Sequence, residues 1–125
     1  MSAARTAKLT TSPTLSPVTA CPVEKAIHVI GGKWKLLLLR CLLLNGPQGY
    51  NQLLAAIAGI SPKELTRNLR ELVASGLIER TQGASVRTSQ YALTQLGQGL
   101  MPTFKRLLAW GEKLLSAEST DISVR

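Results

Sequence analysis

The sequence predicts a mainly α-helical domain with one small β-hairpin. Apolar residues recur at helical spacing in several segments, helix-capping signals bracket those segments, and one pair of short alternating runs is typical of strands. At 125 residues the chain has about the length of one domain. We expect a disordered N-terminal arm over 1–20, an ordered domain over 21–116 and a frayed C-terminal tail over 117–125.

The first part of the ordered segment predicts helices that supply most of the core. Cys21-Pro22 begins one helix, with proline at a first helical position, and Gly31-Gly32 ends it. The segment 33–44 has leucine on nearly every side, which is typical of a helix in the centre of a domain. A short helix over 52–58 follows, with Asn51 as its expected cap.

The best-defined helix begins after Ser61. Ser61 and Glu64 have the spacing of a capping box, Pro62 occupies the first helical position, and Gly76 supplies a left-handed stop. Apolar residues at helical spacing then predict one buried stripe, which consists of Leu65, Leu69, Leu72 and Val73.

The hairpin is predicted from two alternating runs, 77–81 and 89–93, around a Gly/Ser loop. Thr94 then caps a long final helix, which Pro102 is expected to kink or to divide in two. A tightly turned helix pair followed directly by a hairpin is the element order of a winged helix-turn-helix. In that fold the second helix of the pair enters the major groove of double-stranded DNA.

The charge of the chain agrees with a polyanionic partner. Lys and Arg number 15 against 7 acidic residues, which gives a formal charge of +8 and a pI near 10.1. Charged helical positions are most often simply solvated, but here one sign dominates the side of the helix opposite its leucines. The residues predicted to contact DNA are Ser61, Pro62, Lys63, Thr66, Arg67 and Arg70 on this helix, and Arg87 in the wing, at the backbone or in the minor groove.

Several ordered motifs carry a resemblance to a known family. They are Cys-Pro at 21–22, Gly-Gly-Lys-Trp at 31–34, Gly-Ile-Ser-Pro-Lys at 59–63, Leu-Thr-x-x-Leu-Arg-x-Leu at 65–72, Gly-Leu-Ile-x-Arg at 76–80 and Tyr-x-Leu-Thr at 91–94. Over about 21–112 the chain resembles the HxlR-type winged helix-turn-helix transcriptional regulators, which are close to the MarR group. The resemblance implies a homodimer, formed through the first and last helices, that binds an inverted-repeat operator and more often represses than activates.

The wing departs from the pattern of this family. The segment 81–90 lacks the Pro-Pro and Val-Glu-Tyr common there, and Arg87 lies one residue from the usual arginine. The segment 49–51 replaces a more basic stretch, so the resemblance does not extend to backbone contacts near Gln48.

Cys21 is a candidate sensor of oxidants. The positive end of a helix dipole favours a thiolate at this position, and in several members of the family that the chain resembles the cysteine of the Cys-Pro motif responds to oxidants or electrophiles. The alternative is that Cys21 only begins the helix beside a dimer interface. Cys41 lies among leucines and is expected to be an inert core residue.

Other classes of function find little support. A single histidine, His28, and no cluster of ligands at metal spacing argue against an enzyme or a metal site, and we expect no cofactor. A winged-helix module that contacts protein or RNA remains the alternative. The apolar run 36–44 is shorter than the roughly 20 residues of a membrane span, and few cysteines favour a cytoplasmic location. No motif in the sequence identifies a small-molecule effector.

Overall fold

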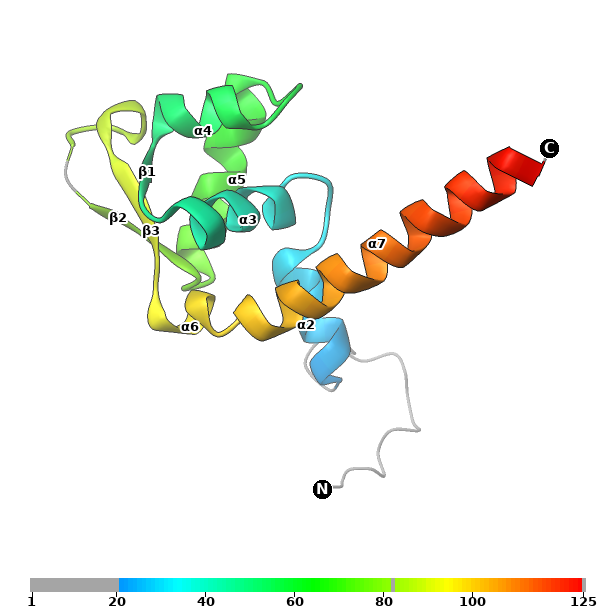
Figure 1. The fold of residues 1–125 in the computed structure, drawn as a ribbon. Coiled ribbons are helices and arrows are strands. Elements are labelled where there is room, and N and C mark those ends of the chain that lie inside the picture. The colour runs from blue at the N-terminus through cyan, green and yellow to red at the C-terminus, as the bar shows by residue number, and fades with distance from the viewer. Residues whose placement is uncertain (1–20, 82, 125) are drawn as a thin grey trace.

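The computed structural model describes residues 21–81 and 83–124, with side chains as far as Ser119. The predicted arm over 1–20 lies outside the described residues. A mainly α-helical fold with a small antiparallel sheet confirms the predicted fold class (Figure 1). In chain order the elements are α2 (Pro22–Ile30), α3 (Lys35–Asn45), β1 (Gln48–Gly49), α4 (Tyr50–Ala56), α5 (Pro62–Ala74), β2 (Ile78–Thr81), the 3-10 turn η2 (Val86–Thr88), β3 (Gln90–Leu93), α6 (Gln95–Gln98) and α7 (Met101–Val124).

The sheet has three strands in the order β1-β3-β2. Strands β2 and β3 form the predicted hairpin, with Ile78 opposite Leu93 and Thr81 opposite Gln90. The sequence analysis missed β1, which pairs Gln48 with Tyr91. A two-residue strand has no alternation to detect, because it exists only through the hydrogen bonds that β3 offers.

Helix α5 begins and ends as predicted. The Ser61 hydroxyl accepts from the Glu64 amide at 3.1 Å, and the Ser61 amide donates to the Glu64 carboxylate at 3.0 Å. These bonds satisfy amides that the first turn leaves without helical partners. At the other end Gly76 adopts φ +81°, a left-handed conformation that glycine adopts without steric cost.

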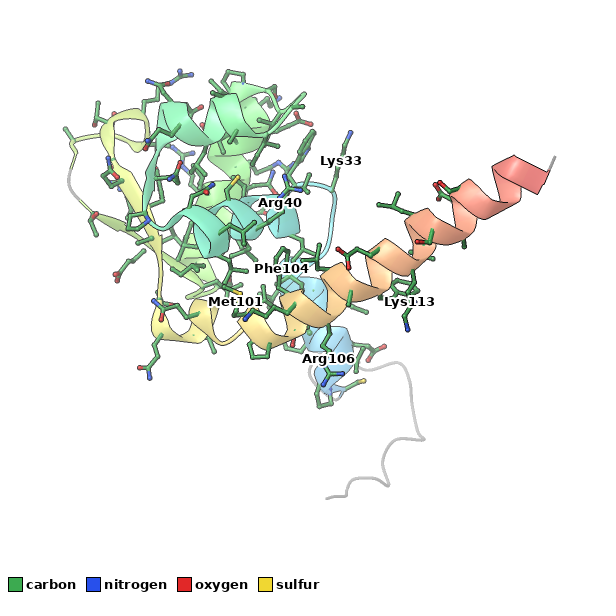
Figure 2. The ribbon with its side chains drawn as sticks, in the orientation of Figure 1. Lys33, Arg40, Met101, Phe104, Arg106 and Lys113 are labelled. Carbon is green, nitrogen blue, oxygen red and sulfur yellow. The ribbon has the colours of Figure 1, made fainter. Side chains whose placement is uncertain are left out.

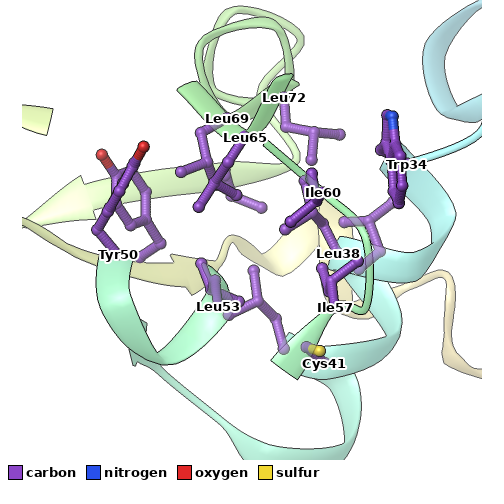
Figure 3. Packing of buried hydrophobic residues seen from close by; sticks show 14 of the residues in the cluster. Trp34, Leu38, Cys41, Tyr50, Leu53, Ile57, Ile60, Leu65, Leu69 and Leu72 are labelled. Carbon is purple, nitrogen blue, oxygen red and sulfur yellow. The ribbon is translucent and has the colours of Figure 1, made fainter. Parts of the chain in front are cut away.

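One hydrophobic core lies between α5, α3, α4 and the sheet. Leu65, Leu69 and Leu72 of α5 are almost fully buried, and Figure 3 shows them facing Leu38 of α3 and Leu53 of α4. Burying a leucine contributes about 1.5–3 kcal/mol. The stripe therefore fixes which side of α5 faces solvent. Val73, also assigned to the stripe, is 38% exposed at its edge.

Some helix boundaries differ from the prediction. Helix α4 begins at Tyr50 rather than Gln52, so Gly49 and not Asn51 is its cap, and the Gly49 amide donates to the Gln52 side chain at 2.7 Å. The burial of Tyr50 explains the earlier start, since its ring must enter the core at the first helical position.

The final helical segment is divided, one of the outcomes expected near Pro102. Thr94 caps α6, its hydroxyl accepting from the Gly97 amide at 3.1 Å, and α7 starts afresh at Met101 with Pro102 in its first turn. Helix α7 extends to Val124 and so includes part of the predicted tail over 117–125, and no Gly or Pro follows Gly111 in the sequence. Phe104 is buried against the body, whereas Lys113 lies on the part of α7 that projects away from it (Figure 2).

Candidate nucleic-acid interface

An open depression of about 760 Å³ lies where α5 meets the wing, the segment of β2, η2 and β3. It brings together all the residues that the sequence predicted to contact DNA. Its lining consists of Ser61, Pro62, Lys63, Thr66, Arg67, Arg70, Glu71 and Arg87.

The cationic side of α5 follows directly from its apolar side. Because Leu65, Leu69 and Leu72 are held in the core, positions offset from them by about half a turn must face solvent. Lys63, Arg67 and Arg70 are all exposed there, and Thr66 is half-buried between them. The helix of 13 residues is about 20 Å long, a length that a major groove accommodates.

Arg87 reaches the depression from the wing. Its guanidinium lies 5.2 Å from the centroid of the Tyr50 ring, within the range of a cation–π contact. The backbone that carries it is folded back by a hydrogen bond from the Tyr91 hydroxyl to the Val86 carbonyl at 2.9 Å and one from Ser89 to Ser85 at 2.6 Å. The wing arginine is therefore held over α4 and beside α5, although its sequence position departs from the family pattern.

Tyr50 is a residue of this region that the sequence analysis missed. It is 1% exposed, and its hydroxyl lies 3.1 Å from both the Pro62 carbonyl and the Thr66 hydroxyl, at the start of α5. Tyr50 lies three and four positions before Leu53 and Leu54, the helical spacing that places side chains on one face. Nothing in that local pattern reveals the polar contacts, because their partners lie 12 and 16 positions away.

Glu71 moderates the positive charge of the depression. Its carboxylate pairs with Lys35 at 2.8 Å and with Arg67, one turn earlier, at 3.7 Å. The hydrogen bond from Lys35, reinforced by the nearby charges of Lys35 and Arg67, lowers the pKa of Glu71 from its ordinary value. The carboxylate is ionised at neutral pH and restrains Arg67 from the side of α3.

Glu64 serves the cap and also ties α5 to the preceding loop. Hydrogen bonds from Ser61 lower the pKa of Glu64, and the Trp34 indole donates to its second oxygen at 3.2 Å. Trp34 is a core residue, and the Lys33 ammonium lies 4.6 Å from its ring centroid. The N-terminus of α5, which carries Lys63, is thus anchored to Trp34 of the core.

The described residues contain no group of His, Cys, Asp or Glu side chains suited to hold a metal ion. Among them, too, no helix combines the length and apolarity that crossing a membrane requires.

Comparison with known proteins identifies the family. Residues 29–119 match the model of the HxlR-like helix-turn-helix. The chain belongs to this family. It is 42% identical over 93 residues to YkvN of Bacillus subtilis, an uncharacterized HTH-type transcriptional regulator, covering 74% of this chain and 78% of the relative. HxlR-like proteins are transcriptional regulators and not enzymes, which confirms the resemblance drawn from the motifs.

Solved structures of similar chains agree with this HxlR-like fold. The redox regulator HypR in its reduced form superposes with a TM-score of 0.70 at 33% identity, covering 80% of this chain and 99% of that one. The quinone-bound regulator YodB of B. subtilis gives a TM-score of 0.65 at 30% identity, with coverage of 74% and 99%.

The cysteines of this HxlR-like chain lie in different environments. Cys21 is partly exposed directly before α2, and its carbonyl accepts from the Lys25 amide at 2.9 Å. Cys41 is 5% exposed in the core, as expected. Both are free thiols. His28 is exposed on α2, outside the core.

Proposed function

We propose that this regulator binds double-stranded DNA with sequence specificity, by placing α5 in a major groove and Arg87 of the wing on the flanking backbone. The single observation that carries the proposal is the depression that gathers Lys63, Thr66, Arg67 and Arg70 with Arg87 from a distant part of the chain. Its cations suit phosphates, and Thr66 and the arginines suit base edges.

The direction of α5 supports this assignment. Its first turns carry the residues of the depression, so the positive end of the helix dipole lies at the same end of α5 as the cationic side chains and favours phosphates there. Glu71 is the acidic residue of the lining, and its carboxylate forms ion pairs with Lys35 and Arg67. The depression therefore keeps a net positive charge.

We further propose that the chain acts as a homodimer through α2 and α7. Along α7, an apolar stripe at helical spacing is exposed in one chain and consists of Leu107, Leu108, Leu114 and Leu115, with the partly exposed Gly111 between them. Trp110 on the same helix is 59% exposed, and Val23 and Ile27 of α2 are 65% and 61% exposed. Apolar surface of this extent on helices that project from the body favours a protein partner (Figure 1). A two-fold dimer would place its α5 helices roughly 34 Å apart, or a multiple of that, which suits an inverted-repeat operator. We propose that the dimer bound to such an operator represses the neighbouring gene.

A redox response is proposed as a property of this dimer. HypR is described as a redox regulator, and Cys21 is the partly exposed thiol among the described residues, next to the proposed interface. Oxidation at Cys21 would alter the start of α2 and thereby the dimer. Affinity for DNA that does not change on oxidation would remove this part of the proposal.

Fluorescence anisotropy with DNA from upstream of the regulator's own gene tests the main proposal. Full-length protein is titrated at several salt concentrations, before and after thiol oxidation, with shuffled duplex of the same composition as the control. We expect tight binding to the upstream duplex, weaker binding to the shuffled one, and an affinity that falls steeply with salt. Equal and weak binding to both duplexes would reject sequence-specific recognition.

A further inference from the structure

The hydroxyl of Tyr50 lies between two oxygen atoms of α5. It is 3.1 Å from the carbonyl oxygen of Pro62 and 3.1 Å from the hydroxyl oxygen of Thr66. Both distances are within the range of O–H···O hydrogen bonds, and the tyrosine is buried to 1% exposure. Water therefore has little access to this phenol, so its hydrogen-bond partners must be groups of the protein.

Only one arrangement of protons satisfies both contacts. A carbonyl oxygen carries no proton, so the contact with Pro62 requires the single proton of Tyr50. The Pro62 carbonyl oxygen has a second lone pair, with which it also accepts the helical hydrogen bond from the Thr66 amide. The contact between Tyr50 and Thr66 then requires the proton of Thr66. If Tyr50 instead donated to Thr66, its oxygen would face the Pro62 carbonyl with no proton between them.

We infer that Thr66 donates its hydroxyl proton to Tyr50 and presents only lone pairs to the groove, so that it reads bases whose edge carries a donor. In the major groove those donors are the N6 amino group of adenine and the N4 amino group of cytosine. The O6 of guanine and the O4 of thymine are acceptors and would meet lone pairs at this position. This inference rests on the proposed DNA-binding function.

Tyr50 is therefore a positioning residue that sets the hydrogen-bonding character of Thr66 from outside the groove. Thr66 lines the depression together with Lys63 and Arg70, whereas Tyr50 does not line it. A threonine free to rotate would accept from one base and donate to another, and so would discriminate poorly. The buried phenol removes the second option.

Phenylalanine at position 50 isolates the effect of the hydroxyl. The ring of Tyr50 lies under the Arg87 guanidinium and within the core, and Tyr50→Phe keeps the ring in both roles. The variant removes only the acceptor for the Thr66 proton and the donor to Pro62. In Tyr50→Phe the Thr66 hydroxyl is free to donate, so guanine and thymine become acceptable at its base pair.

The experiment has one part without DNA and one part with it. Neutron diffraction of the free protein locates the hydroxyl deuterons of Tyr50 and Thr66 directly. In parallel, full-length wild type, Tyr50→Phe, Thr66→Val and Thr66→Ser each select binding sites from a randomised duplex library, and competition anisotropy ranks all base pairs at each position. The position that Thr66 reads is the one where Thr66→Val loses its preference.

We expect the deuterons on Tyr50 toward Pro62 and on Thr66 toward Tyr50. At the position read by Thr66, wild type and Thr66→Ser should prefer adenine or cytosine by roughly two- to tenfold, and replacing adenine by purine, which lacks the amino group, should abolish that preference. Tyr50→Phe should lose the preference at this position alone.

Three results would overturn the inference. The first is a Tyr50 deuteron directed at Thr66. The second is a wild-type preference at that position that persists when the amino group of the preferred base pair is removed, as when adenine is replaced by purine. The third is a Tyr50→Phe variant that weakens all duplexes equally, as a merely structural residue would. If no sequence is enriched by wild type, the proposed DNA-binding function fails together with base reading, while the neutron map still decides the orientation of the hydroxyls.

Discussion

Replacing Ser61 with alanine tests how the N-terminus of α5 is held. The Ser61 hydroxyl accepts from the Glu64 amide at 3.1 Å, and the reciprocal bond runs from the Ser61 amide to the Glu64 carboxylate at 3.0 Å. Ser61→Ala removes the first bond and leaves the second, because the latter uses a backbone donor. The freed amide lies at a half-buried site that water still reaches, so its desolvation penalty is only partial.

The expected loss is about 1 kcal/mol of unfolding free energy, the middle of the range for N-cap removal. For a domain of this size, that lowers the melting temperature by about 4–8 °C. Urea unfolding followed by circular dichroism measures the free energy, and a thermal scan measures the melting temperature. Ser61→Thr keeps the hydroxyl and should recover most of the loss.

Ser116→Ala is the matched control for this change. Ser116 is exposed within α7, and alanine there should leave stability unchanged or slightly raised, because alanine is the better helix former. The reasoning would be refuted if Ser61→Ala unfolded at the same urea concentration as wild type, or if Ser116→Ala lost as much stability as Ser61→Ala.

Further predictions concern the core, the groove face, pH and assembly. Leu69→Ala, at 1% exposure, should cost about 2–5 kcal/mol in urea unfolding, and a cost below about 1 kcal/mol would contradict its place in the core. Arg67→Ala should weaken operator binding by about 1–3 kcal/mol in anisotropy if it contacts a base, whereas an unchanged titration would exclude it from the groove. The pKa values of Glu64 and Glu71 are lowered below the ordinary 4.5, so their stabilisation is complete above that pH and is lost as pH falls through the folded values. Glu64→Gln should therefore flatten the acid side of the stability profile, and a profile parallel to that of wild type would argue against the assignment. For the proposed dimer, Leu115→Asp should lower the sedimentation coefficient to that of a monomer, and an unchanged coefficient would remove α7 from the proposed interface.

Local signals in the sequence were sufficient for α5 and for the hairpin. The capping box, proline at the first helical position and Gly76 act within a few residues of one another, so their pattern is readable along the chain. The cationic side of α5 followed from the same pattern, because a buried leucine stripe determines the opposite side. The winged helix-turn-helix class could therefore be predicted from the sequence.

Other features depend on residues that are distant in the sequence. Strand β1 consists of two residues and exists through its pairing with β3, about forty positions later. The early start of α4 follows from burial of Tyr50, which the expected cap at Asn51 did not anticipate. Helix α7 continues to Val124, within the segment where a frayed tail was predicted.

By itself the sequence determined which side of α5 is apolar and which is cationic, since both follow from helical periodicity and require no partner. Only the tertiary structure decided that Arg87 lies above the ring of Tyr50 and that the hydroxyl of this tyrosine meets Pro62 and Thr66. The physical reason is that a hydrogen bond or a cation–π contact depends on distances of a few ångströms between groups that chain folding, and not local propensity, brings together.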